Sequence, residues 1–249
     1  MKPTLIRLRR LPIMALMTVV ACAFSLLGRN AAAQKSAGKE VTAIEILLEP
    51  DKVMFRHAAA ANARLLSVYP SGYPLDALHA PHITIVQRFV RTADLDKAYA
   101  AAGRVFAREN VTGMKLRATG YYYAQDRSIG LASIVIEPTF ELIKLQQDLL
   151  DAIAPYTEKT GTVAAFATNR ENLDVNPAGI ASIATFVPKA SGKNFNPHVF
   201  VGIAEAGYLN GMFTEPFDAF TFSPVGASVY QVGNNGTAMT KLHSFQLKD

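Results

Sequence analysis

The sequence contains a single cysteine, Cys22, within an apolar run of 17 residues from Leu11 to Leu27. Four basic residues precede this run and Ala31 to Ala33 follow it, which is the order expected of a secretory signal peptide. With cleavage expected after Ala33, the exported chain has no cysteine. Disulfides, thiol catalysis and cysteine-based metal sites are thereby excluded.

Two other fates of this N-terminal segment are open. A retained anchor is disfavoured because the run lies just below the usual length of a spanning helix. Lipid attachment at Cys22 is the rival interpretation, since Val19-Val20-Ala21-Cys22 loosely resembles a bacterial lipobox, but residues 23–27 after it are apolar. We therefore expect a signal peptide over 1–33, a flexible leader over 34–40 and one domain over 41–249 in a periplasmic protein.

The exported chain also lacks an excess of positive charge. The whole chain carries 25 basic and 20 acidic residues, but five of the basic ones and none of the acidic ones lie in residues 1–33. The remainder therefore holds 20 of each sign and has a net charge of zero. A broad polyanion-binding surface is not expected, so any phosphate recognition must be local and long nucleic acid is an unsuitable partner.

Apolar periodicity and turn residues predict strands alternating with helices in the first part of the chain. Val41 to Leu48 is a buried strand, and Asp51 is placed to cap the helix that follows. The expected order continues with a helix over 51–68, a loop over 69–74, a strand to about Val90, a helix over 94–110, strands over 114–123 and 129–136, and a helix from Pro138 to Pro155.

The second part is richer in strands. Residues 156–196 form a long, weakly patterned connection with a short helix expected over 178–186. A strand from His198, a short helix or turn over 204–213, strands over 217–222 and 227–232, a turn over 233–236 and a strand over 239–247 follow. This mixture predicts an α+β protein of two lobes, each an antiparallel sheet with helices on its outer face, around a central cleft.

Two near-copies of one short segment organise the chain. Pro81-His82-Ile83-Thr84-Ile85-Val86 returns as Pro197-His198-Val199-Phe200-Val201-Gly202. Side chains of a strand alternate between its faces, so His82 shares a face with Thr84 and His198 shares one with Phe200. We expect the two strands to face each other and to present one histidine each.

Paired histidines suit acid/base catalysis, because an unperturbed imidazole titrates near neutral pH. One neutral ring can accept a proton from water while one charged ring protonates the departing oxygen of a phosphodiester. The hydroxyl of Thr84, on the face of His82, is placed to donate a hydrogen bond to a phosphoryl oxygen.

These motifs resemble the 2H phosphoesterase superfamily, which contains the bacterial 2′-5′ RNA ligase-like proteins and cyclic phosphodiesterases. The resemblance covers roughly Val41 to Leu247 and rests on two His-x-Thr/Ser motifs; His82-Ile83-Thr84-Ile85 matches in full. It implies a bilobal α+β fold and opening of 2′,3′-cyclic phosphates without a metal or other cofactor. His82 and His198 would be the acid/base pair, and Thr84 would donate a hydrogen bond to the phosphate. The partner would be a small nucleotide or a short RNA end carrying a cyclic phosphate, bound by a monomer.

The second motif departs from this pattern at Phe200, which replaces the hydroxyl residue. Loss of one preorganised donor costs on the order of 10²–10³ in rate. Lys193 and Asn196 are candidate substitutes, and Phe200 is a candidate platform for a base. The alternative function is therefore a weak or inactive protein that binds a nucleotide or phosphorylated ligand. A third is an envelope interaction protein that keeps only the fold.

Other candidate residues have weaker patterns. His57, His79 and His243 have no partner motif and are assigned to surface or core positions, and no close His/Asp/Glu spacing supports a metal site. The run Tyr121-Tyr122-Tyr123 is typical of a strand. Arg88, six residues after His82, falls on the histidine face by parity, at a solvated strand end.

Overall fold

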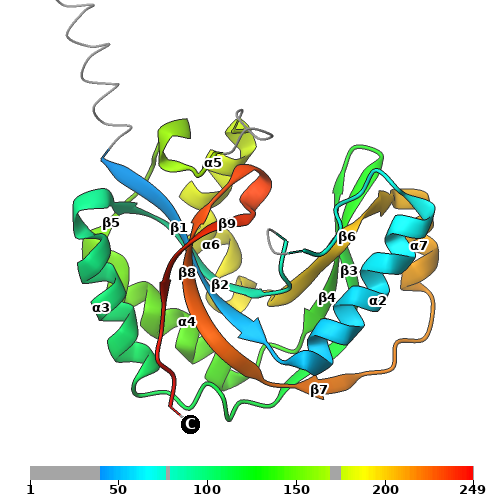
Figure 1. Ribbon diagram of the computed structural model, residues 1–249, viewed down its shortest axis with the longest axis horizontal. Coiled ribbons are helices and arrows are strands. Elements are labelled where there is room, and N and C mark those ends of the chain that lie inside the picture. The colour runs from blue at the N-terminus through cyan, green and yellow to red at the C-terminus, as the bar shows by residue number, and fades with distance from the viewer. Residues whose placement is uncertain (1–39, 77–78, 169–174, 249) are drawn as a thin grey trace, which may run out of the picture. The chain divides into compact units, whose positions relative to one another are not determined.

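Two antiparallel sheets form the scaffold of the protein (Figure 1). The computed structural model describes residues 40–76, 79–168 and 175–248, so the predicted signal peptide and almost all of the leader lie outside it. The first sheet has the order β5-β2-β1-β8-β9 and the second the order β6-β4-β3-β7. Their strands are β1 (Val41–Pro50), β2 (Ile83–Arg91), β3 (Leu116–Asp126), β4 (Ile129–Ile136), β5 (Thr157–Glu158), β6 (His198–Glu205), β7 (Phe220–Phe222), β8 (Pro224–Val232) and β9 (Ala238–Ser244).

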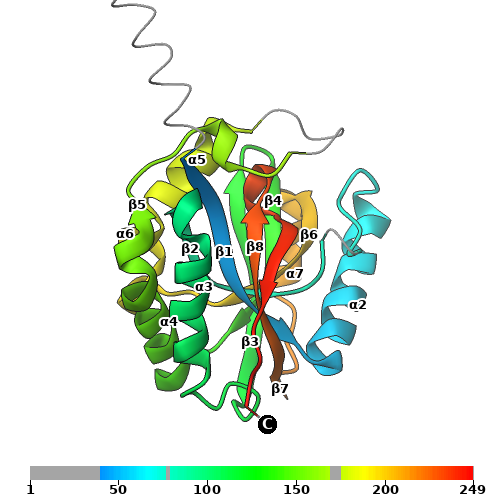
Figure 2. The same cartoon turned by 60° about the vertical axis from the view of Figure 1, so that its left-hand side comes forward.

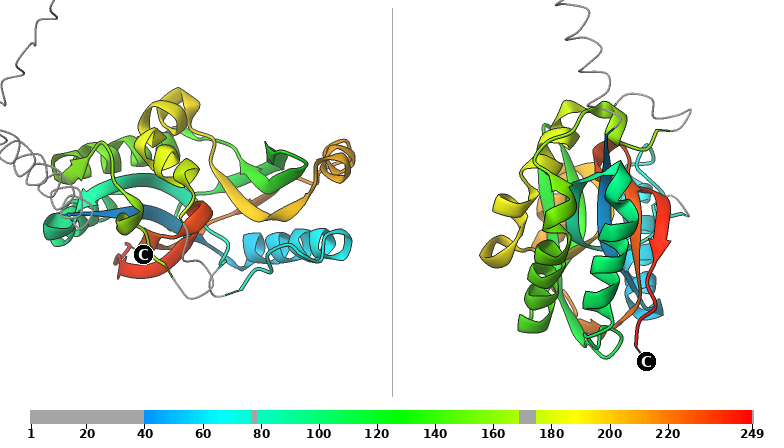
Figure 3. Two further views of the ribbon diagram at one scale, coloured as in Figure 1. Left: turned by 90° about the horizontal axis from the view of Figure 1, so that it is seen from above. Right: turned by 90° about the vertical axis from the view of Figure 1, so that its left-hand side faces the viewer.

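Two helices cover one face of the first sheet, α5 packs on part of its opposite face, and two helices cover one face of the second sheet. Helices α3 and α4 pack against each other and against β2, and Figures 2 and 3 show them side by side. On the second sheet, α2 packs against β6, and α7 contacts β3, β4 and β6. The helices are α2 (Lys52–Val68), α3 (Leu95–Phe106), α4 (Phe140–Ile153), α5 (Pro177–Ala184), α6 (Phe186–Ala190) and α7 (Ala206–Phe213). None of the helices in the described ranges is long and apolar enough to cross a membrane.

Side chains alternate along β1, so its apolar and acidic residues lie on opposite faces of the first sheet. Ile44, Ile46 and Leu48 are buried in the hydrophobic cluster that also contains the apolar residues of α3 and α4. Glu45 and Glu49 therefore belong to the opposite face, away from these helices. Part of that opposite face is closed by a second cluster in which Phe89 packs with Phe166 and Ile183. The polar residues of the face lie beside this cluster.

Local signals in the sequence account for the helix starts. Asp51 caps α2 as predicted, since its carboxylate accepts hydrogen bonds from the backbone N–H groups of Val53 and Met54. Thr139 caps α4 through a bond from Leu142 N–H. The α+β prediction of two antiparallel sheets with helices packed on them is confirmed. The two-residue strand β5 was not predicted.

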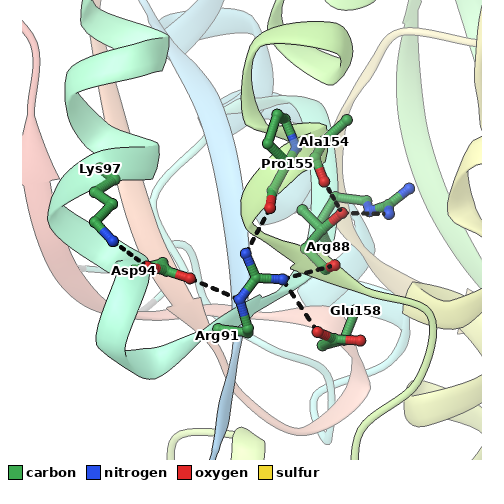
Figure 4. A network of polar contacts seen from close by, with 8 residues as sticks. Arg88, Arg91, Asp94, Lys97, Ala154, Pro155 and Glu158 are labelled. Carbon is green, nitrogen blue, oxygen red and sulfur yellow. Dashed lines mark hydrogen bonds and ion pairs between the residues drawn. The ribbon is translucent and has the colours of Figure 1, made fainter.

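The predicted position of Arg88 is wrong, because a bulge interrupts β2. Ile46 pairs with Val86 but the next residue, Leu47, pairs with Thr84, which leaves Ile85 as an extra residue. The bulge reverses the parity, so Gln87 rather than Arg88 shares the face of Thr84. Arg88 donates instead to the Thr157 hydroxyl (2.7 Å), at the edge of the ion-pair network of Arg91 in Figure 4. Burial lowers its pKa.

Candidate active site

The first histidine is held at the entrance to β2. His82 directly precedes the strand, and its Nδ1 lies 2.7 Å from the carbonyl oxygen of Ala80. Because a carbonyl only accepts, Nδ1 is the donor of this bond. Its Nε2 lies 3.2 Å from Oε1 of Glu45.

The second histidine is the first residue of β6. Its Nδ1 lies 2.7 Å from the carbonyl oxygen of Asn196, two residues earlier, just as Nδ1 of His82 bonds to the carbonyl two residues before it. Both rings are thus oriented by the same local bond, with Nδ1 toward the backbone and Nε2 turned away from it. The repeated Pro-His motif therefore repeats in geometry as well as in sequence.

The two rings differ in their electrostatic surroundings. Burial by itself would lower the pKa of His82, but the charge of Glu45, with the bonds to Glu45 and to Ala80, outweighs it and raises the pKa above its ordinary value of 6.5. Burial lowers the pKa of His198, and the nearby charge of His82 lowers it further. The two imidazoles therefore interact electrostatically, and β2 and β6 are in contact. The expected meeting of the two histidine strands is found.

Sequence reasoning missed Glu45, which completes the first motif. The carboxylate is fully buried on β1 and accepts a 2.6 Å hydrogen bond from the Thr84 hydroxyl. The signal was a single charge inside the apolar run Val41 to Leu48; a buried charge needs partners and often marks a functional site. That Thr84 donates a hydrogen bond to a substrate phosphate stays a prediction. Its hydroxyl would have to turn away from Glu45 to make that bond.

Phe200 lies among residues of the second sheet that the strand registers place on one face. It pairs with Ser133 on β4, and Ser133 pairs with Tyr122 on β3. His198 lies two residues before Phe200 and so shares this face. Tyr122 is exposed, whereas its neighbours Tyr121 and Tyr123 pack edge-on against phenylalanines. The face of the second histidine thus carries two aromatic rings and the buried Ser133, whose hydroxyl sequence reasoning missed.

The two candidate substitutes for the missing hydroxyl have different positions. Lys193 is exposed in the 3₁₀ turn Gly192–Asn194, close in sequence to His198. Asn196 is exposed, and its backbone carbonyl orients His198. Contact of either side chain with a substrate stays a prediction.

Two buried amides that sequence reasoning also missed connect the strands of the two motifs. Asn62 of α2 donates to the carbonyls of Tyr73 and Val201 (2.8 and 2.9 Å) and accepts from Leu75 N–H. It thereby links β6 to the segment that leads toward His82. Gln146 of α4 donates to the carbonyl of Ile85 in the β2 bulge and to that of Ala190, and accepts from Gly192 N–H. Both histidine strands are therefore fixed by buried hydrogen bonds from helices.

The three other histidines contact residues other than His82 and His198. His57 stacks on Phe220, and His243 stacks on Tyr99 with ring centroids 4.9 Å apart. His79 bonds to Asp76. Within the described ranges, no group of three or more histidine, cysteine or acidic side chains is placed to hold a metal ion.

Comparison with known proteins identifies the fold. No protein-family model matches the sequence, and no curated protein does. Among solved structures, TT0787 of Thermus thermophilus matches over 83% of this chain and 98% of its own, with 14% identity and a TM-score of 0.51. Escherichia coli LigT complexed with 3′-AMP is 14% identical over 84% of this chain and 99% of its own, with a TM-score of 0.40. TT0787, the match with a TM-score above 0.5, is a 2H phosphoesterase superfamily member. The chain has the 2H phosphoesterase fold. The resemblance seen in the motifs therefore holds at the level of the fold.

Proposed function

We propose that the protein is a phosphodiesterase that opens 2′,3′-cyclic phosphates, or similar small phosphodiesters, by two-histidine acid/base catalysis without a metal. The observation that carries this proposal is the pair His82 and His198, two imidazoles oriented alike whose pKa values are displaced in opposite directions. Environments that separate the pKa values of two titratable groups are what acid/base pairs require.

The reaction needs only the two rings and water. One imidazole accepts a proton from water while the water oxygen bonds to phosphorus. The bond from phosphorus to one ribose oxygen then breaks, and that oxygen takes the proton of the other imidazole. The product is a phosphate monoester, and proton exchange with solvent restores both rings. A small substrate is favoured because 20 basic and 20 acidic residues after position 33 give no cationic excess.

The first prediction is direct turnover. The purified protein, incubated with 2′,3′-cyclic AMP and an excess of EDTA, should release the nucleoside monophosphate, measured by chromatography. EDTA should leave the rate unchanged, because proton transfer by imidazole needs no metal. A preparation of His82→Ala made in parallel detects contaminating nucleases. Absence of turnover, or turnover that EDTA abolishes, would contradict the proposal.

The alternative function is a binding protein with the same fold. Two observations favour it: Phe200 supplies no hydroxyl, and the Thr84 hydroxyl donates to Glu45. Calorimetric titration with the same cyclic nucleotide separates the two functions. Binding without turnover would support the binding protein.

We also propose that the protein is exported, on the strength of the N-terminal sequence. The second prediction is that mass spectrometry of the protein isolated from the periplasm finds a chain that begins after Ala33. A cytoplasmic chain that retains residues 1–33 would contradict export.

A further inference from the structure

Glu45 is a buried carboxylate that the two-histidine mechanism does not use. It lies on β1, the central strand of its sheet, between Gln87 on β2 and Tyr230 on β8. Its relative exposure is 0%. A buried carboxylate is costly unless charged or hydrogen-bonded groups surround it. The groups that contact Glu45 therefore indicate its role.

Three side chains converge on this carboxylate. Oε1 accepts the Thr84 hydroxyl at 2.6 Å and lies 3.2 Å from Nε2 of His82, while Oε2 accepts the Gln87 amide at 3.3 Å. The oxygen near His82 is thus already occupied by a short bond from Thr84, which fixes it in position. Both partners of this oxygen belong to the first histidine motif.

The surroundings of His82 favour the charged form of its ring. Nδ1 faces the carbonyl of Ala80 and Nε2 faces the carboxylate of Glu45, and both of these groups are acceptors. A neutral imidazole carries one N–H, whereas the imidazolium carries two. With Nδ1 as the donor to Ala80, a neutral ring would place the lone pair of Nε2 beside the Glu45 carboxylate, whereas the imidazolium forms an ion pair with it. The geometry therefore favours a protonated His82.

Among the described residues, none pairs with His198 as Glu45 pairs with His82. The bond of its Nδ1 to the Asn196 carbonyl uses one N–H and is compatible with the neutral ring. The groups with an electrostatic effect on it are His82 and, more weakly, Glu45. The next charged pair on the Glu45 face is Glu49 with Lys241 of β9, and Lys241 lies over the ring of Tyr230. A neutral His198 leaves the lone pair of Nε2 free to accept a proton.

We infer that Glu45 is a positioning residue that keeps His82 protonated, so that His82 is the general acid and His198 the general base. This inference rests on the proposed function and names the direction in which the proton moves. His198 Nε2 takes a proton from water as the oxygen–phosphorus bond forms, and His82 Nε2 gives its proton to the ribose oxygen as the phosphorus–oxygen bond breaks.

The test is Glu45→Gln, which keeps the size and an acceptor oxygen but removes the charge. The matched control is Glu49→Gln, on the same strand and the same face, whose carboxylate bonds to Ser228 and Lys241 and not to either histidine. Imidazole resonances are titrated by NMR in each protein and assigned with the two His→Ala variants, and kcat/KM for 2′,3′-cyclic AMP is measured against pH.

In the parent, His82 should titrate above pH 6.5 and His198 below it. The rate should therefore rise with pH as His198 loses its proton and fall at higher pH as His82 loses its own. Glu45→Gln should increase the acid dissociation constant of His82 about tenfold or more, since loss of an adjacent charge shifts a pKa by about a unit or more. The alkaline limb of the profile should move furthest, to lower pH, because the effect of Glu45 on His198 is weaker than its effect on His82. Glu49→Gln should leave both limbs in place.

The outcomes separate this inference from the proposed function. An unchanged His82 titration in Glu45→Gln, or movement of the acid limb instead, overturns the role of Glu45 while the parent still turns over substrate. A parent that does not turn over substrate overturns the proposed function, whereas the NMR titration still shows whether Glu45 controls His82. If Glu45→Gln does not fold, the parent decides: His198 titrating above His82 overturns the inference.

Discussion

Replacing His198 with alanine is expected to lower kcat/KM for 2′,3′-cyclic AMP by about 10²–10⁴, the usual contribution of a positioned acid or base. β6 pairs with β4 through backbone hydrogen bonds, so removal of the ring should leave the strand in place. His82→Ala should cause a loss of similar size with this substrate. The assay is steady-state kinetics at neutral pH, with circular dichroism to show that each variant is folded.

The choice of leaving group separates the two histidines. A p-nitrophenyl phosphodiester releases an oxygen that is stable as an anion and needs no protonation. If His82 is the acid, His82→Ala should regain most of the parent rate on this substrate, whereas His198→Ala should stay slow because water still has to lose a proton. The reverse pattern would exchange the roles.

His243→Ala is the control for these variants. His243 stacks on Tyr99 of α3 and also packs against Phe245, so its loss tests for a general effect of removing an imidazole. Its kcat/KM should stay within a few fold of the parent. Equal losses in all three variants would show that the effect is not catalytic.

Much of the site was readable from the sequence because its signals are local. A proline before a histidine at a strand start marks both motifs, and the carbonyl two residues before each histidine then orients the ring in the same way. The cap at Asp51 was likewise predicted from its neighbours. A helix cap and the orientation of a ring by a nearby carbonyl depend on a few consecutive residues, so both can be predicted from the sequence.

What the sequence concealed depends on contacts between distant residues. The bulge at Ile85 changes the parity of β2 and takes Arg88 off the histidine face, and counting by twos does not detect it. Glu45 meets Thr84 across 39 positions, and Ser133 meets Phe200 only through strand pairing. The sequence shows that Phe200 replaces the hydroxyl residue of the second motif. It does not show that the neighbouring strand β4 places the Ser133 hydroxyl on the same face.

The amide of Asn62 is one of these long-range contacts, and Asn62→Ala is expected to lower the free energy of unfolding by about 0.5–2.5 kcal/mol. Asn62 is 5% exposed, and its bond to the Val201 carbonyl is buried. The alanine variant leaves that carbonyl without its donor, and each buried polar group left unpaired costs about 1–3 kcal/mol. Alanine is the better helix former, which offsets the loss by about 0.5 kcal/mol.

Chemical denaturation of the parent, Asn62→Ala and Arg56→Ala measures this effect. Arg56 lies on the exposed face of the same helix, so its replacement tests helix propensity alone and should change the free energy of unfolding by less than about 0.5 kcal/mol. A loss in Asn62→Ala no larger than that of Arg56→Ala would mean that water replaces the amide at Val201. The larger loss would show that α2, through one side chain, holds β6 against the segment that leads to His82.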